Sequence, residues 1–295
     1  STDFDEINFR DRINTIINKF ENPEKIYIAS SIISSAESID SVKRDMRIFA
    51  PIALGLMIIL FIISFRSWTG TFLPLFVVGF SIIWTFGLMA WLDISVPIIG
   101  GLIPIMLIAI SNNYGIHIIS HYYEFTKMNQ ELSRVEILKR TMKRLGMPIF
   151  LAGITTVISF LILMSHELSK VREVGLMVSF GIVVSFVLSL LLIPAILILV
   201  PRPTYLGKEK SLHFINKFLV NWGKFFIKNR VSFLTILFSG IFIFSIGIRD
   251  ITVDTVPDNY FPEDSKIRKS SKVISKTFGG ATQLNILIEG DIYDP

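Results

Sequence analysis

The chain has 295 residues, of which 51% are hydrophobic and 18% are charged, with 25 phenylalanines and no cysteine. This composition indicates an integral membrane protein and excludes disulfides and thiolate metal sites. The net charge of +5 comes from basic residues that gather in loops between apolar runs, a pattern of membrane topology and not of a nucleic-acid-binding surface.

The first 46 residues are mixed in polarity and predict an α/β segment. Apolar residues at helical spacing predict a helix over 4–20, and alternation predicts a short strand over 25–33. Ser34 or Ser35 then caps a helix that continues into the first apolar run. The chain has no initiator Met and stops directly after a strand-like stretch, so we expect it to be a segment of a longer protein.

Six apolar runs follow, each long enough to cross a bilayer. They cover 49–65, 71–92, 98–119, 147–165, 175–200 and 231–248. The link 67–70 predicts a tight turn, with Trp68 placed for a membrane interface.

The loops 120–146 and 201–230 are rich in Lys and Arg and are expected to be cytoplasmic, which places both chain ends outside. An amphipathic pattern over 211–229 predicts a helix lying on an anionic leaflet. The stretch 132–145 predicts only a short connector.

Beyond the sixth run the chain is again α/β in character. Alternation predicts strands over 250–256 and 284–289. Asp264 or Ser265 caps a helix between them, and Gly279-Gly280 ends it.

The third run turns polar without losing its helical character. Asn113, His117, Ser120 and Glu124, hereafter the polar stripe, recur at spacings of four, three and four and share one helix face. Polar groups at membrane depth are costly, so they normally face a bundle interior or a wet cavity. The stripe, with its neighbours Asn112, Tyr114 and His121, is therefore the candidate functional site. The alternative is that these groups only hydrogen-bond a neighbouring helix, with His121 and Glu124 at the headgroup boundary.

Four stretches together resemble the resistance-nodulation-division (RND) superfamily, in its hydrophobe-exporter branch related to the mycobacterial large membrane proteins. They are Phe65-Arg66-Ser67 with Gly70 and Pro74; 109–117 (Ala-Ile-Ser-Asn-Asn-Tyr-Gly-Ile-His); 152–160 with 171–175; and 260–265 with 278–280 and 288–290. Their order and spacing cover most of the chain.

The resemblance implies a mainly α, twelve-helix transporter built from two repeats, each with an extracytoplasmic α/β domain. This chain then holds helices two to seven. Its parts are 1–46, the end of the first outer domain; 47–202, a five-helix bundle resembling the sterol-sensing arrangement; 203–230, a basic linker; 231–249, the helix opening the second repeat; and 250–295, the start of the second outer domain.

The implied function is proton-driven export of a lipid or other hydrophobic molecule across the bacterial cytoplasmic membrane, without a cofactor. Membrane lipids, protons and a periplasmic accessory protein are the implied partners, and no nucleic acid is expected. The sequence shows no nucleophile–base pair or phosphate loop, so we expect no enzyme activity. His117 and His121 lack a third ligand, so we expect no metal site.

One departure from the family pattern is important. The family's fourth helix carries an Asp before Tyr that takes and releases the coupling proton, whereas here Asn113 precedes Tyr114. Asn cannot titrate. Either His117 replaces the carrier, or the other half of the protein supplies it and Asn113 only hydrogen-bonds; we favour the second interpretation. Thr155 and Thr156 on the next helix are candidate relay partners, with back-bonding to their own helix as the alternative.

Two further classes of function remain open. A lipid-sensing scaffold would bind a lipid in the helix bundle and control a partner without transporting anything, and loss of the Asp favours it. An ion channel would need a ring of charged or carbonyl ligands, for which the sequence offers no pattern.

Overall fold

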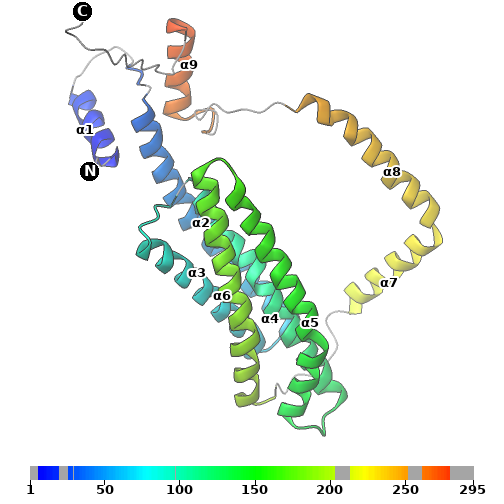
Figure 1. Ribbon diagram of the computed structural model, residues 1–295. Helices are drawn as coiled ribbons and strands as arrows, with labels where there is room; N and C mark the ends of the chain where they lie inside the picture. The colour runs from blue at the N-terminus through cyan, green and yellow to red at the C-terminus, as the bar shows by residue number, and fades with distance from the viewer. Residues whose placement is uncertain are drawn as a thin grey trace, which may run out of the picture. The chain divides into compact units, whose positions relative to one another are not determined.

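The computed structural model describes residues 6–19, 26–28, 30–96, 98–202, 213–251 and 261–279, and all regular structure within them is helical (Figure 1). The elements are α1 (Glu6–Lys19), α2 (Ser31–Phe65), α3 (Trp68–Trp91), the 3-10 helix η1 (Ile98–Leu102), α4 (Ile103–Met128), α5 (Arg134–Leu161), η2 (Ile162–Ser165), α6 (Ser169–Leu199), α7 (His213–Lys228), α8 (Arg230–Gly247), η3 (Ile248–Asp250) and α9 (Lys266–Phe278). Six helices are long and apolar enough to cross a membrane, which confirms the expected polytopic, mainly α fold. The chain divides into two compact units, residues 42–225 and residues 1–41 with 226–295.

The strand expected over 25–33 is wrong where the structure describes it. Residues 26–28 are irregular, and α2 begins at Ser31. The Ser30 hydroxyl accepts a hydrogen bond from the backbone N–H of Ile32 at 3.3 Å, which satisfies a free donor at the start of α2. The helix therefore begins before the expected cap at Ser34 or Ser35. The strands expected over 250–256 and 284–289 lie almost wholly outside the described residues.

The connector expected over 132–145 and the span expected over 147–165 form one continuous helix, α5. Ser133 caps it by accepting from the backbone N–H of Glu136 at 3.2 Å. Pro148 lies inside α5 without ending it, although the membrane span was expected to begin at residue 147. A proline removes one backbone hydrogen bond, and membrane helices tolerate that loss.

The turn between α2 and α3 is shorter than the expected 67–70. Arg66 adopts a left-handed backbone conformation (φ 47°), and Ser67 already caps α3 by accepting from the backbone N–H of Gly70. The Tyr123 hydroxyl of α4 donates to Ser67 Oγ at 3.1 Å. A side chain at position 70 would lie 2.8 Å from Phe65 Cβ, so only glycine allows this close approach.

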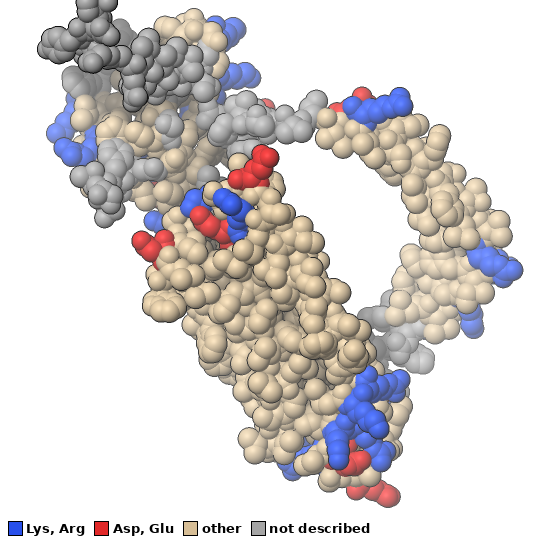
Figure 2. Space-filling model, in the orientation of Figure 1, with Lys and Arg blue, Asp and Glu red and all other residues tan. Residues whose placement is uncertain are grey.

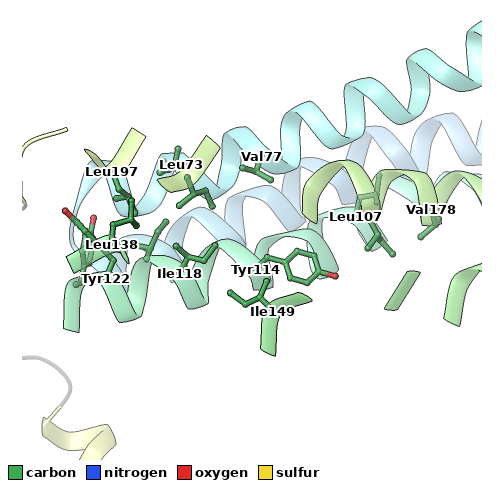
Figure 3. Close-up of a cluster of buried hydrophobic side chains, with 14 of the residues drawn as sticks. Leu73, Val77, Leu107, Tyr114, Ile118, Tyr122, Leu138, Ile149, Val178 and Leu197 are labelled. Atoms are coloured by element: carbon green, nitrogen blue, oxygen red, sulfur yellow. The ribbon is translucent and has the colours of Figure 1, made fainter. Parts of the chain in front are cut away.

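Helices α3, α4, α5 and α6 pack closely around one buried core (Figure 3). In the centre, the Ser81 hydroxyl of α3 donates to the Gly181 carbonyl of α6 at 2.6 Å. A Cβ at Gly181 would lie 2.6 Å from both Leu107 and Thr85. Small residues at such contacts let helix backbones approach, which is how helices associate in lipid.

Two local features of the second unit follow from side-chain capping and charge. Ser265 caps α9 by accepting from the backbone N–H of Arg268 at 3.3 Å, and Gly279 ends it at φ 80°, as the sequence predicted. Arg10 of α1 donates to the Asp40 carboxylate of α2 at 2.5 Å, and this hydrogen bond raises the pKa of the guanidinium.

We predict that Gly181→Ala destabilises the bundle by about 1–3 kcal/mol, because the added methyl group overpacks a site whose neighbours are buried. Gly79→Ala is the matched control, since nothing lies within 4 Å of a Cβ there. Thermal unfolding of the purified protein in detergent measures both. Equal stability of the two variants would show that the α3–α6 contact is not tightly packed.

Candidate functional site

The polar stripe lies on the outer face of the α3–α6 bundle. Asn113, His117, Ser120 and Glu124 are all exposed in the described chain. In the described residues these groups do not face the interior of the α3–α6 bundle, which was one of the two environments expected for them, the other being a wet cavity. The reason is that the opposite face of α4 is apolar or small and packs into the core; it comprises Leu107, Ile108, Ser111, Gly115, Ile118, Ile119 and Tyr122.

Tyr114 points the other way and is buried, with 4% of its surface exposed. Its ring packs edge-on against Phe186 of α6, with centroids 5.6 Å apart, and it lies beside Ile118 and Ile149 in Figure 3. The Tyr114 hydroxyl has no hydrogen-bond partner in the described residues. The Asn113–Tyr114 pair is thus split between the outside and the inside of the bundle.

Asn112 is half-buried and links α4 to α2. Its side-chain amide donates to the Met57 sulfur at 2.9 Å. Met57 belongs to a second apolar cluster with Phe61, Val78 and Ile108, which holds α2 against α3 and α4. Neither Met57 nor Phe186 could be singled out from the sequence, because the long apolar parts of α2 and α6 that hold them give no periodic signal.

Thr155 and Thr156 of α5 both bond back to their own helix. The Thr155 hydroxyl donates to the carbonyls of Leu151 and Ala152 at 2.9 and 3.0 Å, and the Thr156 hydroxyl donates to Ala152 at 2.8 Å. Thr156 is nevertheless a side-chain neighbour of the Tyr114 hydroxyl. The structure therefore brings the Tyr114 and Thr156 hydroxyls near one another without a hydrogen bond between them.

His121 and Glu124 lie one turn beyond the polar residues at the centre of α4. His121 Nδ1 is 2.9 Å from a Glu124 carboxylate oxygen, but without the alignment of a hydrogen bond. Among the residues that the structure describes, no three His, Asp or Glu side chains come together as a metal site would require.

Asn113 and His117 lie in the middle part of one candidate membrane span, Gly100–Met128. Asn113 is ten residues into α4, about 15 Å from its start at ~1.5 Å per residue. The hydrocarbon core of a bilayer is about 30 Å thick. An amide and an imidazole inside that core would require cover from protein or a water-filled path.

Six apolar helices, four of them packed around one core, define a multi-pass helical membrane protein. The chain belongs to the MMPL family, whose model matches residues 4–224.

Two curated relatives support this assignment. Over 149 residues, half of this chain, it is 29% identical to a Methanocaldococcus jannaschii protein named as a membrane protein, MJ1562, and covers 38% of it. Over 165 residues, 53% of this chain, it is 24% identical to a Mycobacterium bovis protein named as a probable transport protein, MmpL8, and covers 15% of it. The chain thus spans well under half the length of these relatives.

We predict that Tyr114→Phe leaves thermal stability unchanged or slightly raised, because the lost hydroxyl has no partner in the described residues. Tyr123→Phe is the control, since it removes the hydrogen bond to Ser67 and costs about 1 kcal/mol. Thermal unfolding compares the two. If Tyr114→Phe destabilises the protein as much as Tyr123→Phe, the Tyr114 hydroxyl has a partner in the complete protein.

Proposed function

We propose that the protein is a secondary active transporter that moves a lipid or other hydrophobic molecule outward across the cytoplasmic membrane, driven by protons. The observation that carries the proposal is the polar stripe, which is exposed on the outer face of the α3–α6 bundle and begins in the middle part of a candidate membrane span. Membership of the MMPL family and the similarity to a protein named as a probable transport protein support it.

The proposed mechanism follows from the cost of polar groups in lipid. A stripe that cannot face acyl chains is covered by a further helix bundle, and the second half of the protein is the expected cover. A protonation change at this interface shifts the balance between two packings of the bundles. The outer domains then pass the substrate away from the membrane.

The proton carrier is assigned to the covering half and not to α4. Asn113 cannot titrate, so its role in the proposal is to hydrogen-bond across the interface. His117 lies one turn along the same face and is the alternative carrier, because imidazole changes its charge near pH 6.5. Tyr114 and Thr156 stand behind Asn113 and support its helix from inside the bundle.

The proposed topology uses the positive-inside rule. The basic loops lie in the cytoplasm, α7 rests on the anionic leaflet, and both chain ends are extracytoplasmic, joining the two outer domains. A periplasmic accessory protein would contact those domains.

We predict that His117→Ala and Asn113→Ala each slow proton-dependent transport by only about threefold, the size expected for one interhelical hydrogen bond. The pH dependence should stay intact in both. The assay is lipid flux in proteoliposomes of the full-length protein under an imposed pH gradient. Loss of pH dependence in His117→Ala alone would contradict the prediction and identify His117 as the proton carrier.

The matching gain-of-function variant is Asn113→Asp, which restores the carboxylate of the family pattern. We expect a folded protein whose flux is unchanged or more sensitive to pH. A variant that fails to fold would show that the site is dry and unpaired in the assembled protein, against the proposed polar interface.

A lipid-sensing scaffold is the second candidate, and Asn113 is the observation that favours it. Such a protein would bind lipid in the bundle and control a partner without a transport cycle. In the same proteoliposomes, folded protein that binds lipid but shows no proton-dependent flux would favour the sensor over the transporter.

A further inference from the structure

Two arginines tie together the basic end of the α3–α6 bundle. Arg134, the first residue of α5, donates to the carbonyls of Ile198 and Val200 at 3.1 Å, at the end of α6. Arg202, just beyond α6, donates to the carbonyl of Gln130 at 2.6 Å and to that of Leu132, in the loop between α4 and α5. The guanidinium of Arg134 thus binds the chain just before Arg202, and the guanidinium of Arg202 binds the chain just before Arg134.

Tyr122 lies at the same end of the bundle as the two arginines, because its neighbours are Leu138, one turn after Arg134, and Leu197, which precedes the carbonyls that Arg134 binds. Tyr122 is 1% exposed and stands beside Leu138 and Leu197 at one end of the buried core (Figure 3). Its hydroxyl has no hydrogen-bond partner in the described chain, although the Thr126 side chain, which donates to the Tyr122 backbone carbonyl, is nearby. A buried donor without an acceptor is costly. The Tyr122 hydroxyl therefore needs a group that accepts its hydrogen bond.

The positive charge of the two arginines is not balanced by a carboxylate. In the described residues neither forms an ion pair, and the acids nearby are engaged elsewhere or apart: Glu136 is 3.2 Å from Arg140, Glu124 is 2.9 Å from His121, and Glu131 is exposed on the loop. Helix carboxyl ends carry about half a negative charge each. The carboxyl ends of α4 and α6 therefore offset part of the charge of the two arginines, whereas the amino end of α5, at Arg134, adds to it.

Other basic side chains surround this end. Figure 2 shows Lys and Arg gathered at one end of the bundle, with few acidic residues among them. Lys139 and Lys143 of α5 are exposed there, and the Arg144 guanidinium lies 5.8 Å from the Phe125 ring centroid. The potential at this end therefore attracts an anion before any contact is made.

We propose that Arg134, Arg202 and Tyr122 form a binding site for a phosphate group, such as the phosphodiester of a lipid headgroup. The unused donors of two planar guanidinium groups match phosphate oxygens in geometry, and the Tyr122 hydroxyl gains its missing acceptor. A phosphodiester carries the opposite charge to this excess. The site lies where α4, α5 and α6 meet, so an occupied site fixes their ends relative to one another.

The test is binding of defined ligands to the purified full-length protein in a neutral detergent. The ligands are phosphatidylglycerol, diacylglycerol with the same acyl chains and no phosphate, and inorganic phosphate. Native mass spectrometry counts bound lipid, and thermal unfolding reports inorganic phosphate. We expect phosphatidylglycerol to bind at least about tenfold more tightly than diacylglycerol, because charge-assisted hydrogen bonds are lost without the phosphate.

The decisive variant is Arg134→Gln with Arg202→Gln, which keeps amide donors for the carbonyls but removes the charge. We expect its affinity for phosphatidylglycerol to fall about tenfold or more. The charge-matched control, Lys139→Gln with Lys143→Gln, should lose less than about threefold because distant charges are screened. Equal loss in the two double variants would overturn the site in favour of general attraction to the basic end.

Tyr122→Phe keeps both arginines and serves if the arginine variant does not fold. Because the hydroxyl has no present partner, its removal should leave thermal stability unchanged while weakening phosphatidylglycerol about fivefold. Unchanged affinity in Tyr122→Phe, or equal binding of diacylglycerol and phosphatidylglycerol by the native protein, would refute the proposal. Stabilisation by inorganic phosphate supports the site with free phosphate as the source, and binding of phosphatidylglycerol alone supports the headgroup.

Discussion

Close backbone contact between helices is the constraint on which this structure depends. Lipid chains are as apolar as the side chains of the helices, so burying apolar surface gives little reason for helices to associate in a bilayer. The bundle instead relies on sites with no room for a side chain. Gly115 faces Pro74 and Ile193, Gly153 faces the Phe186 ring, and Gly181 receives the hydrogen bond from Ser81. These contacts place α6 against α3, α4 and α5 at the same time.

The polar stripe is a consequence of this packing. Once Gly115, Ser111 and Tyr122 direct one face of α4 into the core, the residues half a turn away must lie outside. The protein thereby presents an amide and an imidazole outside the α3–α6 bundle, in the middle part of a candidate membrane span. This surface, and not an internal cavity, is the feature through which we connect the bundle to transport.

Much of the fold could be predicted from sequence, because the signals were local. Apolar runs gave the six spans, and Ser265 with Gly279 gave both ends of α9. The boundary near Pro148 was wrong because only the apolar run begins there, whereas the helix begins at Arg134 and includes the basic stretch before that run. The strand near residue 26 was wrong because alternation over a few residues does not distinguish a strand from the start of a helix.

The site was harder to predict than the fold. Helical spacing placed Asn113, His117, Ser120 and Glu124 on one face, but spacing does not say which face meets the core. That choice depends on shape complementarity among α3, α5 and α6, which is a property of all four helices together. Several contacts join residues more than fifty positions apart in the chain and leave no local pattern. They are the contacts of α4 with Met57 and with Phe186, and the hydrogen bonds of Arg134 and Arg202 to backbone carbonyls.

The unbroken course of α2 has a mechanical consequence. Its 35 residues make a rod about 52 Å long at ~1.5 Å per residue, and it runs from water-facing sequence at Ser31 through to Phe65. A continuous helix resists bending between its turns, because each turn is hydrogen-bonded to the next. Pro51, where one backbone hydrogen bond is missing, is the point at which this lever can flex.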